Sequence, residues 1–124
     1  MIDFKNASFM KLKPVDPSVW AGKLSGILLP GETIDQAFKG IRDGVVFTDK
    51  RIIAINVQGL TGKKVDYTSL PFSKIQAFSV ETAGTFDLDS ELDLWFSGLG
   101  NVRFEFVTTA DVARICRAIG EKVL

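Results

Sequence analysis

Between residues 34 and 106, the chain consists of short segments in which apolar and polar residues alternate, separated by brief turn sequences. Alternation with a period of two is typical of β-strands that bury one face. The segments that we predict as strands are residues 34–39, 45–47, 51–58, 64–69, 75–81, 86–96 and 102–106. Their connections are too short for crossover helices, so we predict an antiparallel meander of seven strands and exclude βαβ units.

One helix is predicted on each side of this run of strands. The first begins at Asp16, a good N-cap residue, with Pro17 in its first turn, and is stopped by Pro30. Its apolar face consists of Trp20, Leu24, Ile27 and Leu28. The second is predicted to be capped by Thr108, with Asp111 three residues on. Its apolar stripe consists of Val112, Ile115, Cys116, Ile119 and Val123, which can close one open end of a barrel.

Composition excludes several kinds of catalytic and metal site. The 124 residues include no histidine and one cysteine, Cys116. Serine–histidine and cysteine–histidine catalysis, histidine metal sites and thiolate clusters therefore lack the residues that they need. Fifteen basic and fifteen acidic side chains cancel, so a basic nucleic-acid surface is not indicated. We predict a protein that is not an enzyme, needs no cofactor or metal, and binds no nucleic acid.

No segment of the sequence is typical of a membrane span or a secretory signal. The longest stretch without a charged residue covers residues 52–62, which is 11 residues, whereas a spanning helix needs about 20. The N-terminus carries Asp3 and Lys5 and has no long apolar run. We therefore expect a cytoplasmic protein.

Two charged clusters are candidate binding surfaces. The polar face of the predicted strand 86–96 presents the acidic residues Asp87, Asp89, Glu91 and Asp93. This row starts like a calcium loop, but Leu92 and Gly98 stand where such a loop needs glycine and a bidentate carboxylate. It is either a solvated strand face or an acidic interaction surface. The basic cluster lies around strand ends and comprises Lys39, Arg42, Lys50, Arg51, Lys63 and Lys64.

Charge also differs between the two parts of the chain. Residues 1–75 carry a net charge of +4 and residues 76–124 carry −4. Two copies of such a chain can pair head to tail, unless the two signs simply lie on separate solvated faces. Trp95 is expected on the polar side of its strand, either as an interface anchor or lying flat over a neighbouring strand.

Several blocks of the sequence resemble the bacterial pleckstrin-homology-like (PH-like) domains. They are residues 39–53, 59–67, 69–71, 81–92 and 95–98, and they include Arg42-Asp43, Thr48-x-x-Arg51, Gly62-Lys63-Lys64 and the run from Glu81 to Asp87. The similarity covers roughly residues 24–106. It implies a mainly β fold with terminal helices: a PH-like split barrel of seven antiparallel strands, closed by the C-terminal helix. Residues 16–124 would form this single domain, and residues 1–15 an N-terminal arm.

The resemblance also implies self-assembly, because single-domain members of the family form cyclic rings, with five-fold symmetry expected here. Adjacent copies meet through their strands and share a polar surface for a protein partner. We therefore predict a non-enzymatic, ring-forming interaction module. Its contact surface is predicted to combine Arg42, Asp43, Lys50, Arg51, Lys63 and Lys64 with Glu81, Asp87, Asp89, Glu91 and Asp93. The alternative is a membrane-surface module that binds anionic lipid through Lys39, Arg42, Lys63 and Lys64.

Overall fold

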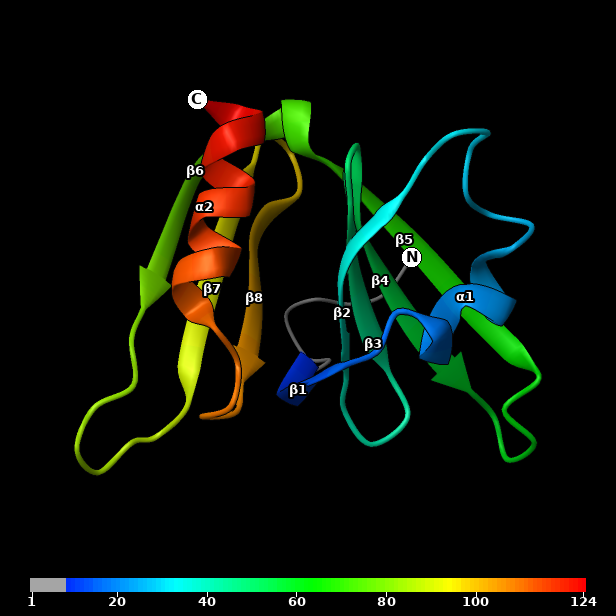
Figure 1. Ribbon diagram of the computed structural model, residues 1–124, viewed down its shortest axis with the longest axis horizontal. Helices are drawn as coiled ribbons and strands as arrows, with labels where there is room; N and C mark the ends of the chain where they lie inside the picture. Colours follow the sequence, from blue (N-terminus) through cyan, green and yellow to red (C-terminus); the bar gives the residue numbers. More distant parts are fainter. Residues whose placement is uncertain (1–8) are drawn as a thin grey trace.

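The computed structural model describes residues 9–124, which form one eight-stranded sheet and two packed helices (Figure 1). The strands run in the order β5-β4-β3-β2-β1-β8-β7-β6 across the sheet. Their bounds are β1 Phe9–Val15, β2 Ile34–Lys39, β3 Gly44–Thr48, β4 Arg51–Gln58, β5 Lys64–Pro71, β6 Ile75–Glu81, β7 Ser90–Phe96 and β8 Gly100–Phe106. The helices are α1 (Ser18–Leu24) and α2 (Val112–Val123), and the 3-10 turn η1 (Phe72–Lys74) joins β5 to β6.

Strand β1 corrects the predicted topology. The arm expected for residues 1–15 falls partly outside the described residues, and its remainder, residues 9–15, forms β1. This strand pairs antiparallel with β2 near Lys13 and parallel with β8 near Leu12. The sheet is therefore mixed and eight-stranded instead of purely antiparallel and seven-stranded. Leu12 is fully buried between the exposed Lys11 and Lys13, so this segment does carry a short pattern with a period of two.

Strand β7 begins at Ser90, later than the strand predicted for residues 86–96. The partner of Ser90 is Phe106, at which β8 ends, so the residues before Ser90 have no neighbouring strand on that side. Residues 82–89 connect β6 to β7 instead. Phe86 in this connection is 100% exposed, and Leu88 is also exposed. The alternation of residues 86–89 thus continues the pattern of the strand without being part of it.

The main core lies between the two halves of the sheet and is covered by α2, which confirms the predicted C-terminal helix (Figure 1). Ile115 and Ile119 of α2 are fully buried in it. The N-cap of α2 is Asp111, whose carboxylate accepts the backbone N–H of Arg114 at 3.1 Å, and not Thr108 as predicted. The helix therefore starts three residues later than a Thr108 cap requires.

A second apolar cluster covers the opposite face of β2–β5, beneath α1. Trp20 is buried there, and its indole Nε1 donates to the backbone oxygen of Phe38 at 3.0 Å. Gly44 permits this packing, because a Cβ at that position would lie 2.2 Å from Trp20 Cζ2. β3 is buried at every residue, since one cluster covers each of its faces.

Helix α1 ends at Leu24, earlier than the predicted stop at Pro30. Ser25 and Gly26 follow directly, and neither favours a helix interior. Ile27 and Leu28 nevertheless pack against the second apolar cluster, as the predicted apolar face requires. Asp16 accepts the backbone N–H of Ser18 at 2.9 Å, but the N-cap of α1 is Pro17 and not Asp16 as predicted, because the helix begins at Ser18.

Candidate interaction surface

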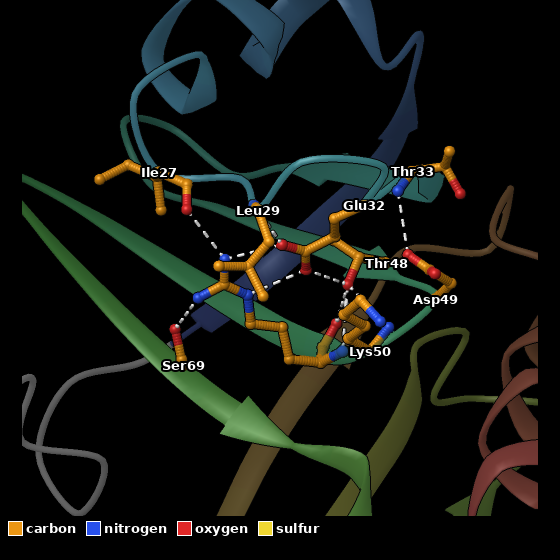
Figure 2. Close-up of polar contacts among 9 residues, drawn as sticks. Ile27, Leu29, Glu32, Thr33, Thr48, Asp49, Lys50 and Ser69 are labelled. Carbon is orange, nitrogen blue, oxygen red and sulfur yellow. Dashed lines mark hydrogen bonds and ion pairs between the residues drawn. The ribbon is translucent and has the colours of Figure 1, made fainter.

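The most extensively bonded polar group of the described chain is a buried ion pair beside the β3–β4 turn (Figure 2). Arg51, the first residue of β4, donates from Nε and Nη2 to the two carboxylate oxygens of Glu32, at 2.9 and 2.8 Å. The Thr48 hydroxyl donates to the same carboxylate at 2.6 Å, and the backbone N–H of Leu29 does so at 2.9 Å. The Glu32 side chain is 0% exposed and that of Arg51 is 17% exposed.

These bonds determine both the charge state and the role of the pair. They lower the pKa of Glu32 from 4.5 to about 2; the bonds from Arg51 make the largest contribution, and burial opposes them. Arg51 also donates to the backbone oxygen of Ile27 and to the hydroxyl of Ser69. The pair therefore holds the segment before β2 against β4 and β5. The structure places Arg51 in this internal network, whereas the sequence suggested an open contact residue.

The remaining basic candidates lie mostly at the tips of two neighbouring hairpins. Arg42, in the β2–β3 turn, donates to the backbone oxygen of Gly59 in the β4–β5 turn and so joins the two hairpins. Asp43 accepts bonds from the side chain of Asn56 and from a backbone N–H of β4. Lys63 and Lys64 are exposed at the second hairpin. Arg42, Asp43, Lys63 and Lys64 are thus brought together.

Two other basic candidates lie apart from these tips. Lys50 is exposed in the β3–β4 turn. Lys39 lies over the Trp20 ring, with its Nζ 5.9 Å from the ring centroid. That distance is within the range of a cation–π contact.

Much of the acidic row is paired within the chain. Asp93 is buried and accepts from Arg103 of β8 at 2.8 Å, and Glu91 lies 3.4 Å from the same guanidinium. Asp89 pairs with Lys11 of β1 at 2.6 Å. The strand pairing thus supplies cations that hold three of the row's four carboxylates.

The pKa values of this row follow from those contacts. The hydrogen bond from Lys11 lowers the pKa of Asp89, and the same bond raises that of Lys11. The hydrogen bond to Asp93 raises the pKa of Arg103. Partial burial raises the pKa of Glu105, whose carboxylate lies 3.8 Å from the Nζ of Lys11. Each shift has a structural ion pair or burial as its cause.

Sequence reasoning missed the roles of Glu32, Thr48, Lys11 and Arg103. A signal for Arg103 existed, because a tight turn between β7 and β8 places it directly opposite Asp93. Glu32 and Arg51 are 19 residues apart, and no local pattern joins them. Trp95 is 38% exposed and points away from the core, as predicted.

The described residues offer little for catalysis or metal binding. Among residues 9–124, no group of three or more His, Cys, Asp or Glu side chains could hold a metal ion. A hollow of about 260 Å³ beside the N-terminus of α2 contains Asp35 and Arg114, which pair with each other at 3.2 Å. The Cys116 thiol is free and half-buried. No helix in this part of the chain is long and apolar enough to cross a membrane.

The chain has close relatives of known sequence. It is 58% identical over 76 residues to the uncharacterised Bacillus subtilis (strain 168) protein YjqA, a match that spans 61% of this chain and 61% of YjqA. It is 33% identical over 106 residues to the uncharacterised YozO of the same organism, which covers 86% of this chain and 91% of YozO.

Solved structures show the same fold. A pleckstrin-homology domain protein of Shewanella loihica PV-4 superimposes with a TM-score of 0.81 at 42% identity, over 93% of this chain and 99% of that one. The pleckstrin homology domain of Shewanella amazonensis SB2B gives a TM-score of 0.69 at 46% identity, over 96% and 93%. The sequence profile of the bacterial PH domain matches residues 3–123. The chain therefore belongs to the bacterial PH domain family.

Proposed function

We propose that this protein is a non-enzymatic interaction module that assembles with copies of itself into a closed ring and offers a polar surface to another protein. The observation that carries this proposal is the pair of sheet edges at opposite ends of the strand order. Within residues 9–124, β5 pairs only with β4 and β6 pairs only with β7. Such edges expose backbone donors and acceptors that a neighbouring chain can satisfy.

The two edges are chemically different, which favours a head-to-tail contact. β5 carries Lys64, Asp66 and Pro71, residues that discourage pairing, whereas the only charged residue of β6 is Glu81 at its end. A contact between two different surfaces closes into a ring when its rotation is a whole fraction of a turn. The separation of charge along the chain, +4 before residue 76 and −4 after it, supplies attraction for such a contact.

The polar surface that we propose for the partner consists of Arg42, Asp43, Lys50, Lys63 and Lys64 together with Glu81, Asp87, Asp89 and Glu91. Asp93 is left out because it is buried and paired with Arg103. Arg51 is left out of this surface because its guanidinium is held by Glu32. The shifted pKa values of Glu32, Asp89 and Arg103 support binding over catalysis, because an ion pair within the chain explains each of them. The matched family and structures are likewise described as PH domains and not as enzymes.

Light scattering after gel filtration tests the assembly at micromolar concentration. A ring gives a mass several times the 13.6 kDa of one chain, and five-fold symmetry gives five times that mass. A mass of one chain throughout the concentration range refutes the proposal.

A second candidate function is attachment to an anionic membrane surface. The observation that favours it is the complete exposure of Ile41 and Leu60 at the two hairpin tips, beside Arg42, Lys63 and Lys64. Apolar tips flanked by cations suit the lipid interface. Sedimentation with phosphatidylserine-containing vesicles tests it. Binding that weakens with salt and is lost in Lys63→Glu/Lys64→Glu supports the membrane role, and absence of binding refutes it.

A further inference from the structure

Two exposed apolar patches of opposite charge lie on different parts of the molecule. The first, which we call the basic tip, consists of Ile41, Arg42, Leu60, Lys63 and Lys64. Its aliphatic side chains are fully exposed. The bond from Arg42 to the backbone oxygen of Gly59 holds its two hairpins together. None of its three cations forms an ion pair within residues 9–124.

The second patch, which we call the acidic loop, consists of Glu81, Phe86, Asp87 and Leu88 in and beside the β6–β7 connection. Phe86 is 100% exposed and Leu88 is 57% exposed. The loop has its own internal bonds, from Gly84 N–H to the Asp87 backbone oxygen at 2.6 Å and from Asp89 N–H to the Asp87 carboxylate at 3.1 Å. Phe86 therefore projects from a turn with a defined shape.

The arrangement of the two patches suits repetition. In Figure 1, the β6–β7 connection lies at the lower left and the β4–β5 connection at the lower right, towards opposite ends of the long axis. A copy placed alongside the first can therefore bring its basic tip to the acidic loop of its neighbour. Repeating that step keeps all the loops on one rim, as a closed head-to-tail assembly requires.

We infer that the acidic loop of one copy docks on the basic tip of the next, with Phe86 and Leu88 packing against Ile41 and Leu60. This inference rests on the proposed self-assembly and specifies its contact. Exposed apolar side chains of this kind mark interaction sites when they gather in one patch. Around them, Glu81 and Asp87 face Arg42, Lys63 and Lys64, so the charges at the rim are complementary. A second copy is the occupant that both patches fit, whereas a membrane explains the basic tip alone.

Complementary charge reversals test the contact. The tip variant is Lys63→Glu/Lys64→Glu, and the loop variant is Glu81→Lys/Asp87→Lys. Each variant alone has two patches of like charge, so each is expected to have the mass of one chain at concentrations at which the wild type assembles. When the two variants are mixed in equal amounts, each reversed patch meets a complementary patch. Because the two variants must alternate along a head-to-tail assembly, we expect mixed oligomers that begin with a 1:1 pair and that close only with an even number of copies.

A matched control separates the contact from a general charge effect. Lys74→Glu/Lys122→Glu changes the net charge as much as the tip variant does, at exposed positions outside both patches. This control is expected to assemble as the wild type does, and far-ultraviolet circular dichroism verifies the fold of each variant. Phe86→Ser provides a second variant, since removing a fully exposed side chain leaves the core intact. It is expected to weaken self-association at least tenfold.

The outcomes distinguish this inference from the function on which it rests. A wild type that is monomeric refutes the proposed ring and the contact together. A wild type that assembles, with tip, loop and Phe86→Ser variants that assemble equally well, refutes only the contact. Loss of vesicle binding by the tip variant with its assembly intact also overturns the contact and assigns the basic tip to the membrane.

Discussion

The buried pair of Glu32 and Arg51 predicts a specific loss of stability in acid. The pKa of the Glu32 carboxyl is lowered from 4.5 to about 2, first by the bonds from Arg51. A carboxyl with a lower pKa in the folded state stabilises the fold above its unfolded pKa, and this contribution disappears as the pH falls through the folded value. At about 1.4 kcal/mol per pKa unit, the contribution of Glu32 near neutral pH is about 3 kcal/mol.

The test compares urea unfolding of the wild type and of Glu32→Gln between about pH 7 and pH 3. The variant keeps the shape of the side chain but leaves Arg51 without its counter-charge, which costs about 3–5 kcal/mol near neutral pH. The wild type loses about 2 kcal/mol of the Glu32 contribution by pH 3, because the unfolded chain binds the proton more tightly. The gap in unfolding free energy between the two proteins should narrow by this amount.

A matched control is Asp35→Asn, which breaks the pair with Arg114. Both side chains of that pair are more than half exposed, so the loss should stay below about 1 kcal/mol. If the difference in unfolding free energy between the wild type and Glu32→Gln is the same at both pH values, the pKa of this carboxyl does not change on folding. The assignment of the acid sensitivity to the buried pair would then be refuted.

Two further substitutions, each with a matched comparison, are expected to lower the free energy of unfolding, measured by urea titration. Gly44→Ala should destabilise the fold by about 1–3 kcal/mol, because the new methyl group would overlap the Trp20 ring. Gly22→Ala in α1 meets no atom within 4 Å and should be neutral or stabilising by up to about 1 kcal/mol; an equal loss in both would exclude the steric explanation. Arg103→Met should cost about 1–3 kcal/mol by leaving the Asp93 carboxylate, 9% exposed, without its cation. Adding Asp93→Asn should recover part of that loss, and full additivity of the two changes would contradict the coupling.

Most strands of this chain can be predicted from its sequence because alternation is a property of residues that are neighbours in the chain. A strand that buries one face needs alternation, and the residues from Ile34 to Phe106 supply it. Strands β3 and β4 depart from this pattern, with continuous apolar runs such as Ile52–Ile55. Such runs indicate burial on both faces of the sheet, and the second apolar cluster, which lies beneath α1, explains them. The sequence thus contained evidence for a covering element on the second face.

The pairing of β1 with β8 is a different case, because it depends on contacts that are distant in sequence. Leu12 and Phe106 come together only when the C-terminal strand is in place. The same reasoning applies to the candidate surface. The register of one hairpin predicts Asp93 opposite Arg103, whereas Lys11 reaches Asp89 only through the tertiary position of β1. Local patterns therefore show which carboxylates exist, and long-range pairing decides which of them are neutralised.

The position of β1 and the ion pairs that it creates bear directly on assembly. β1 pairs with β2 on one side and with β8 on the other, so it joins two groups of strands into one sheet and leaves β5 and β6 as its edges. It also brings Lys11 to Asp89. Arg103 holds Asp93 and Glu91 in the same way. Of the five acidic candidates from Glu81 to Asp93, the two that form no ion pair within residues 9–124 are Glu81 and Asp87, which flank the exposed Phe86. The fold thus places unpaired acidic side chains and exposed apolar surface in and beside one loop, where a contact with a second copy gains from both.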